Sequence, residues 1–160
     1  KKSISKLKLC WIGDANNNMM NSLIEACIKF SVSLNIACPK SYQPNKKLIS
    51  LIKKQKGKIK IFNKKEIAIK NSDVVMTDKI ISLNDKVNKK KKLKSFKNFK
   101  VDTKTMNLAK KDAIFLHCLP RGSEVTEEVF LGKQSKVWQQ ALNRVYVQKS
   151  ILLYCFGKLR

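Results

Sequence analysis

Short apolar runs alternate with helix-like segments along the whole chain, and this alternation constrains the fold more than any other feature. Five runs are short and rich in β-branched or aromatic residues, as strands are. They are Lys6–Ile12, Ser33–Cys38, Lys58–Phe62, Asp73–Thr77 and Ala113–Cys118. Strands that alternate with helices usually form a parallel sheet, because each connection crosses back over the sheet through a helix. We therefore predict an α/β fold with a doubly wound, mainly parallel five-stranded sheet and helices on both faces.

Helical periodicity fills the segments between these runs. Leu23, Ile24, Cys27, Ile28 and Phe30 recur at helical spacing after the first run. Asn45 is expected to cap a second helix that carries Leu48, Ile49, Leu51 and Ile52. Further helices are expected near Lys64–Asn71, Thr103–Lys110 and Gln140–Phe156. No linker rich in glycine, serine or proline divides the 160 residues, so a single domain is predicted.

Polar clusters follow three of the predicted strands. They are "GDANNN" after the first strand, "TDKIIS" after the fourth and "HCLPRG" after the fifth. Ligands of doubly wound sheets bind outside the carboxyl ends of the strands, so we expect the three clusters to converge on one site. The final helix is polar only in its first turns, around Asn143 and Arg144, and Arg144 is therefore the arginine that we expect to be functional.

The residues in these clusters allow more than one interpretation. Asn16, Asn17 and Asn18 could cap the next helix, or offer amide donors and acceptors to a zwitterionic ligand. Asp78 could bind an ammonium group, cap a helix or pair with a lysine. A GxGxxG fingerprint is absent, so NAD binding is not indicated. His117 and Cys118 are adjacent and would point to opposite faces of a strand, which argues against a cysteine hydrolase.

The formal net charge of +24 suggests a polyanion partner when taken alone. Only three of the 35 basic residues are arginines, however, and base recognition favours the arginine fork. The lysine runs Lys53–Lys60 and Lys86–Lys94 also lack aromatic residues for base stacking. We interpret both runs as solvated surface, with nucleic-acid binding as the alternative.

Cysteine use and hydropathy bear on the compartment. The five cysteines show no CxxC spacing and His117 is the only histidine, so neither a metal site nor a disulfide framework is predicted. No apolar run is long enough to span a bilayer, and the first residues do not resemble a signal peptide. We expect a cytoplasmic protein without a membrane partner.

Four segments together resemble the ornithine carbamoyltransferase family, specifically its carboxyl-terminal, ornithine-binding half. These are "WIGDANNNMMNS", "SDVVMTDKIISL", "FLHCLPRGSEVTEEVF" and "ALNR". The resemblance covers essentially all of residues 1–160 and implies a Rossmann-like carbamoyltransferase domain. Aspartate carbamoyltransferases usually carry HPLP where this chain has HCLP, so Cys118 points to ornithine as the acceptor.

The resemblance implies roles for matching residues. Asn18, Asp78, Ser82 and the backbone of Leu83 would hold the α-amino and α-carboxylate groups of ornithine. Cys118 and Leu119 would lie beside the δ-amine and the carbamoyl group, with Cys118 and Asp78 as catalytic residues. Arg144 would contact carbamoyl phosphate. The implied reaction gives citrulline and phosphate for arginine biosynthesis, and requires no metal or organic cofactor.

The chain also departs from the family pattern. Ile80 replaces a usual tryptophan, "SLN" replaces SMG from Ser82, and Leu142 replaces a usual acidic residue, so acetylornithine or putrescine stays an alternative acceptor. The family's amino-terminal carbamoyl-phosphate domain, with its SxRT and HPxQ motifs, is absent from the 160 residues. We therefore expect this chain to be inactive alone. The resemblance implies that the full-length enzyme is a homotrimer, and we expect no nucleic-acid partner.

Overall fold

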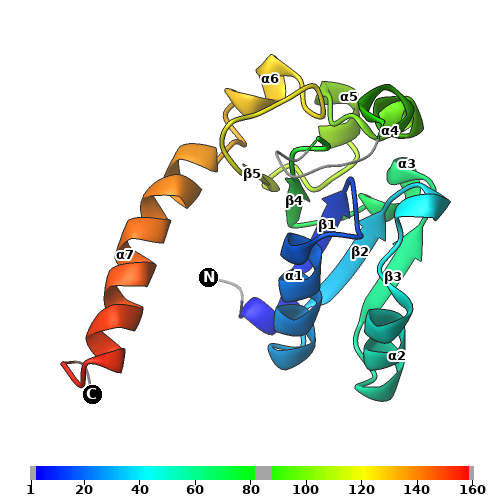
Figure 1. Cartoon of the computed structure of the whole chain (residues 1–160). Helices are drawn as coiled ribbons and strands as arrows, with labels where there is room; N and C mark the ends of the chain where they lie inside the picture. Colours follow the sequence, from blue (N-terminus) through cyan, green and yellow to red (C-terminus); the bar gives the residue numbers. More distant parts are fainter. Residues whose placement is uncertain (1–2, 82–87, 159–160) are drawn as a thin grey trace.

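The computed structural model describes residues 3–81 and 88–158, which form a five-stranded parallel sheet with flanking helices (Figure 1). The strands are β1 (Lys8–Ile12), β2 (Ser33–Ala37), β3 (Ile59–Phe62), β4 (Val74–Thr77) and β5 (Ile114–His117). Their order in the sheet is β3-β2-β1-β4-β5, and all neighbouring pairs are parallel. The predicted doubly wound α/β fold is therefore confirmed.

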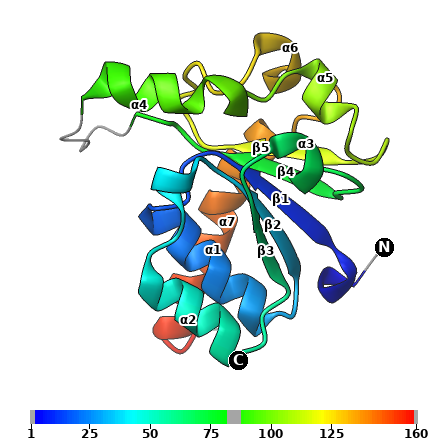
Figure 2. The same ribbon diagram turned by 90° about the vertical axis from the view of Figure 1, so that its right-hand side faces the viewer.

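Helices cover both faces of the sheet, as Figure 2 shows. One face packs against α1 (Asn18–Lys29) and α2 (Lys46–Lys54), whereas the other carries α3 (Lys65–Ala68), α4 (Lys89–Phe96) and α5 (Thr103–Met106). The helices α6 (Glu127–Phe130) and α7 (Val137–Cys155) follow β5, and three single 3-10 turns occupy Ile4–Lys6, Lys40–Tyr42 and Lys97–Phe99.

The central strands β1 and β2 contribute alternate side chains to two separate cores, as the two-residue period of a strand requires. In β1, Trp11 packs into the core beneath α1 and α2, whereas Cys10 and Ile12 pack into the core on the opposite face. In β2, Ile36 and Ala37 divide in the same way. Burial of apolar surface on both faces therefore holds the central strands in the middle of the molecule.

The structure shortens two predicted helices and adds one that the sequence analysis missed. α3 ends at Ala68 and α5 at Met106, before the bounds expected near Asn71 and Lys110. Asn71 has a positive φ of 57°, which is incompatible with a continuing right-handed helix. α4 overlaps the lysine run that was interpreted as solvated surface and continues to Phe96, and Asn88 caps it by accepting a hydrogen bond from the Lys91 N–H.

The helix α7 begins at Val137, earlier than expected, and extends away from the sheet in Figure 1. Its start is attached to β5 by a hydrogen bond from the Lys136 N–H to the Phe115 carbonyl, at 2.9 Å. Many of its large apolar side chains are exposed, including Trp138, Tyr146 and Leu152. Even so, no helix within residues 3–81 and 88–158 combines the length and the apolar composition needed to cross a membrane.

The cap of α2 provides a test of local stability. The Asn45 Oδ1 atom accepts a hydrogen bond from the Leu48 N–H at 3.0 Å, as predicted from the sequence. Replacing Asn45 by alanine leaves this N–H without a side-chain acceptor and should lower the free energy of unfolding by about 1 kcal/mol. Urea denaturation measures the loss, and Asn45→Ser, which keeps a capping oxygen, is the matched control. An equal loss in both variants would contradict the capping role.

Candidate functional site

The strand order brings the ends of β1 and β4 together where connections leave the sheet in opposite directions. Gly13 follows β1 with a φ of +149°, which favours glycine. A Cβ atom on Gly13 would lie 3.3 Å from the Thr77 hydroxyl oxygen at the end of β4. The absence of a side chain therefore lets the loop after β1 approach the loop after β4, as expected at a topological switch point.

The predicted residues Asp78 and Cys118 are in direct contact. The Cys118 thiol donates a hydrogen bond to the Asp78 Oδ1 atom across a sulfur–oxygen distance of 2.7 Å. The same oxygen accepts the Lys79 N–H at 2.7 Å. β4 and β5 are neighbours in the sheet, so their parallel pairing positions both side chains at one edge. Both residues are half-buried, which holds the carboxylate in place while leaving it accessible to a ligand.

A cavity of about 210 Å³ joins this edge to the start of α1. Its lining includes side chains from the loops after β1 and β4 and from α4, among them Asp14, Asn16, Asn18, Asp78, Ile80 and Lys92. The expected convergence of the first and fourth strand ends is therefore confirmed. Two of the predicted ornithine-binding residues, Asn18 and Asp78, line one cavity.

The three consecutive asparagines have different positions. Asn17 caps α1, because its Oδ1 atom accepts the Met20 N–H at 2.8 Å, and its side-chain amide donates to the Asp14 carbonyl at 3.1 Å. The capping interpretation is thus correct for Asn17. Asn16 and Asn18 are exposed and line the cavity, so their amides can reach a ligand.

A buried ion pair that the sequence analysis missed supports the wall of the cavity. The Lys92 Nζ atom lies 2.7 Å from the Asp14 Oδ2 atom, and the two side chains are only 6% and 8% exposed. The ammonium group also lies 5.6 Å from the centre of the Tyr42 ring. The prediction that the lysine run Lys86–Lys94 is solvated surface is therefore wrong for Lys92. Lys92 lies one helical turn before Phe96, which is also buried, and this spacing could have indicated that both side chains face the core.

A second buried pair lies behind Cys118. His117 Nε2 is 2.9 Å from Glu124 Oε1, with side-chain exposures of 0% and 3%. His117 Nδ1 is hydrogen-bonded to the Cys118 carbonyl. Glu124 also accepts the Gly122 N–H and, at 3.4 Å, the Ile80 N–H. The carboxylate therefore connects the loop after β5 to the loop after β4. Sequence reasoning did not identify Glu124, whose only signal was a carboxylate shortly after the single histidine.

The charges of this pair follow from its contacts. Burial alone would lower the pKa of His117, but contacts with the Cys118 side chain, Glu124 and the Cys118 backbone outweigh burial and raise the pKa to about 10. Burial alone would raise the pKa of Glu124, but hydrogen bonds from His117 and the Gly122 N–H lower it. The pair is thus an imidazolium and a carboxylate at neutral pH. His117 Nε2 faces Glu124, whereas the Cys118 thiol donates its hydrogen bond to Asp78.

The other predicted site residues are not among the described residues that line this cavity. Ser82 and Leu83 lie outside the described residues. Leu119 is 45% exposed beside Cys118, and its peptide bond to Pro120 is cis. Arg144 is exposed on α7, one turn after Gln140, whose side-chain oxygen accepts the His117 N–H at 3.1 Å. Within residues 3–81 and 88–158, no group of three or more His, Cys, Asp or Glu side chains could hold a metal ion.

Comparisons with known proteins give one consistent family. Residues 5–155 match the family described as aspartate/ornithine carbamoyltransferase, Asp/Orn binding domain. The ornithine carbamoyltransferase of Methanococcus maripaludis is 45% identical, covering 97% of this chain and 53% of that protein. The one from Caldicellulosiruptor saccharolyticus is 41% identical, with coverages of 99% and 54%. The chain therefore spans about half the length of the curated relatives that it matches.

Solved structures agree with these sequence matches. The anabolic ornithine carbamoyltransferase of Campylobacter jejuni superposes with a TM-score of 0.87 at 38% identity, covering 95% of this chain and 52% of that chain. The ornithine carbamoyltransferase of Pyrococcus furiosus gives a TM-score of 0.86 at 32% identity, with coverages of 99% and 52%. Both solved structures share the architecture of this chain, which covers 52% of each of them.

The His117–Glu124 pair predicts a pH-dependent stability. The pKa of His117 is raised from 6.5 to about 10, so its contribution is complete below about pH 6.5 and is lost as the pH rises towards 10. The pKa of Glu124 is lowered from 4.5, so its contribution requires a pH above about 4.5. Glu124→Gln should therefore cost most between these limits, by about 3 kcal/mol for a broken buried pair, and progressively less towards pH 10.

Chemical denaturation of the wild type and the variant across this pH range measures the effect. Glu127→Gln is the matched control, because Glu127 pairs with Arg121 at 3.3 Å with its side chain 67% exposed. The control should change the free energy of unfolding by less than about 0.5 kcal/mol at every pH. A cost for Glu124→Gln that does not vary with pH would contradict the assigned charges.

Proposed function

The chain belongs to the aspartate/ornithine carbamoyltransferase family, and we propose that it is the ornithine-binding half of an ornithine carbamoyltransferase. In this proposal, the complete enzyme transfers the carbamoyl group of carbamoyl phosphate to the δ-amine of L-ornithine. The observation that carries the proposal is the contact between the Cys118 thiol and the Asp78 carboxylate at 2.7 Å, at the edge of the cavity that Asn18 also lines.

The charge and hydrogen-bonding groups of the cavity suit a free amino acid. The Asp78 carboxylate makes no ion pair in the described part of the chain, so it can accept an α-ammonium group. The Asn18 amide can donate to an α-carboxylate. The nearby Asp14 carboxylate is paired with Lys92 and does not compete for the ammonium group. Ser82 and Leu83, which lie outside the described residues, would complete the amino-acid site.

The proposed reaction forms one carbon–nitrogen bond and breaks one carbon–oxygen bond. The neutral δ-amine attacks the carbamoyl carbon and gives a tetrahedral intermediate. Phosphate then leaves with the electron pair of the broken bond, and the nitrogen loses a proton to give citrulline. Cys118 would lie beside the δ-amine, and Asp78, which accepts the hydrogen bond of the Cys118 thiol, would assist the loss of the δ-amine proton through that thiol. Most of the acceleration would come from aligning two bound substrates and from fixed donors facing the developing negative charge.

Carbamoyl phosphate would bind between this domain and residues that supply the rest of the site. Arg144 is a suitable contact because it lies on the first turns of α7, one helical turn after the Gln140 side chain that holds the end of β5. A guanidinium group binds phosphate oxygens through two parallel hydrogen bonds. We therefore propose that Arg144 and Leu119 contact carbamoyl phosphate from the side of the ornithine domain. We also propose that the full-length chains form a homotrimer and that the enzyme is cytoplasmic.

The same groups favour ornithine over the alternative acceptors. Acetylornithine lacks the free α-ammonium group that Asp78 would bind, and putrescine lacks the α-carboxylate that Asn18 would bind. Competition of both amines with ornithine in the full-length enzyme tests this preference, and weaker inhibition by each is expected. A general nucleic-acid module is not favoured, because one lysine of its basic run is buried in an ion pair.

Substitution of the contacting pair tests the proposed chemistry. Cys118→Ala and Asp78→Asn should each lower the turnover of the full-length enzyme by about 100-fold or more, which corresponds to the loss of one positioned transition-state interaction. Their free energies of unfolding should change by about 1 kcal/mol at most, because both side chains are half-buried. Steady-state kinetics and urea denaturation provide the two measurements. Cys155→Ala, at an exposed position on α7, is the control, and unchanged turnover in both site variants would reject the assigned roles.

Substitution of two neighbouring asparagines distinguishes the loss of an ornithine contact from a general effect on the cavity. Asn18→Ala should raise the KM for ornithine by about tenfold, the cost of one lost hydrogen bond to a charged group. Asn16→Ala is the matched comparison, because Asn16 is also exposed and lines the same cavity, whereas the resemblance to the family assigns the ornithine contact to Asn18. Initial rates at varied ornithine and saturating carbamoyl phosphate measure both. Equal changes in the two variants would contradict a specific role for Asn18.

A further inference from the structure

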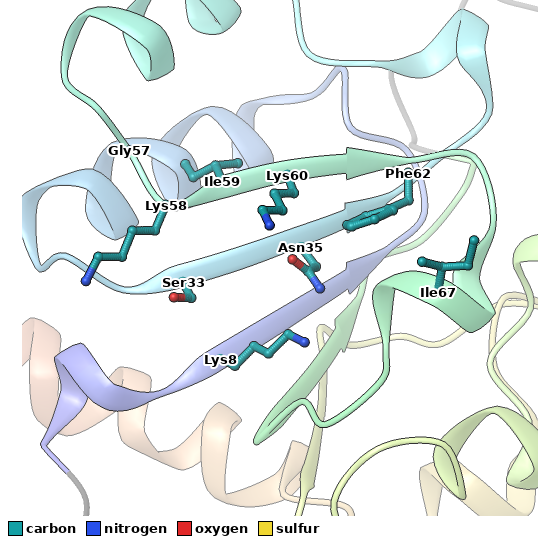
Figure 3. A pocket seen from close by; sticks show the side chains of 9 residues that line it. All are labelled: Lys8, Ser33, Asn35, Gly57, Lys58, Ile59, Lys60, Phe62 and Ile67. Carbon is teal, nitrogen blue, oxygen red and sulfur yellow. The ribbon is translucent and has the colours of Figure 1, made fainter.

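A lysine-rich hollow lies on the sheet at the opposite end of the strands from the candidate site. It has a volume of about 440 Å³ and covers the amino-terminal halves of β1 and β2 and the length of β3 (Figure 3). The polar side chains in its lining are Lys8, Ser33, Asn35, Lys58 and Lys60. None of the residues that line it is acidic. The lining of the hollow is therefore positively charged.

Strand register explains why these side chains gather on one face. Lys8 pairs with Ser33 across β1 and β2, and Asn35 pairs with Lys60 across β2 and β3. Paired and alternate residues of a parallel sheet share a face. The intervening residues Leu9, Leu34 and Ile61 pack instead into the core beneath α1 and α2.

The polar composition of this region indicates an exposed surface. Further along the same strands, Cys10, Ile12 and Ala37 are buried in the core on this face, together with Ala68 of α3. A parallel sheet that is covered on both faces normally carries apolar side chains on both. Lysine, serine and asparagine at the amino-terminal half therefore suit contact with water and a polar ligand better than contact with another apolar element.

The polar groups are positioned to act together. In Figure 3, the ammonium groups of Lys8 and Lys60 lie on either side of Asn35, whereas Lys58 points away along the sheet. Lys8 Nζ donates to the Lys70 carbonyl at 2.6 Å, and the Asn35 amide donates to the Ala68 carbonyl at 2.6 Å. These two bonds hold the floor of the hollow. Lys8 keeps two further N–H donors, and Lys60 keeps three, for a ligand.

We infer that this hollow binds a small molecule that carries a chain of phosphates. Lys8 and Lys60 would contact the phosphate oxygens from β1 and β3, on either side of Asn35, and the Ser33 hydroxyl would donate from the start of β2. Lysine binds phosphate as a compact point charge, so the absence of arginine from the lining is compatible with this ligand. Phe62 and Ile67 form an apolar wall at one end, where a base could rest.

The dimensions distinguish this site from a nucleic-acid surface. The hollow is bounded, and Phe62 is the only aromatic residue in its lining, whereas single-stranded nucleic acid needs an extended groove with several stacking rings. It is also distinct from the proposed carbamoyl-phosphate contacts, because neither Leu119 nor Arg144 lines it, and both follow β5 at the edge of the sheet opposite β3. The inference is therefore independent of the proposed catalytic function.

Lysine footprinting tests the inference in the protein at its natural full length. Brief acylation followed by mass spectrometry would report the reactivity of each lysine with and without tripolyphosphate. Lys8 and Lys60 should be slowed by about fivefold or more, because charge-assisted hydrogen bonds occupy their ammonium groups. Lys47 and Lys53, exposed on α2 across the sheet, should change by less than about twofold, as expected for diffuse electrostatic attraction alone.

Variants and a second ligand sharpen the result. Lys60→Gln should abolish the protection of Lys8, whereas Lys47→Gln should preserve it, and both should retain normal carbamoyltransferase kinetics. Stronger protection by ATP than by tripolyphosphate would indicate that the Phe62 wall holds a base, and equal protection would indicate recognition of the phosphate chain alone. The inference is overturned by uniform protection of all lysines, by protection with long nucleic acid only, or by lysines that are already unreactive without ligand.

Discussion

Parallel pairing of β4 between β1 and β5 is the constraint on which the candidate site depends. It places the carboxyl ends of three strands at one edge, although their sequences are separated by many residues. Gly13 allows close approach on one side of Thr77, and the Cys118 thiol reaches Asp78 on the other. The chemistry thus follows from sheet order, because no local segment contains these groups together.

Two buried charge pairs support this edge from behind. Asp14 and Lys92 connect the loop after β1 to α4, and His117 and Glu124 connect the loop after β5 to the backbone of Ile80. Removing charges from water is costly, so such pairs contribute little net stability compared with apolar residues of similar size. The two pairs instead fix the geometry of the site, because each one restrains a loop next to a proposed substrate contact.

The strands, and the edge of the sheet where the site forms, could be predicted from the sequence. Both predictions rest on local features, namely the alternating apolar runs and the polar residues that follow three of the strands. The sequence correctly indicated that Asn18, Asp78 and Cys118 gather at that edge. It did not reveal Lys92 or Glu124, whose importance depends on partners far along the chain. The extent of α4 was also missed, because its eight residues include five lysines and give only a weak apolar pattern.

The lysines of this chain therefore cannot be treated as one population. Lys92 is buried and neutralises a carboxylate within the candidate site, whereas Lys8 and Lys60 line a hollow without acidic partners in its lining. Both arrangements arise from strand and helix periodicity, which turns some members of a run inward and others outward. Net charge describes the average of these environments, but the burial and partners of each ammonium group determine whether it supports the fold or is available to a ligand.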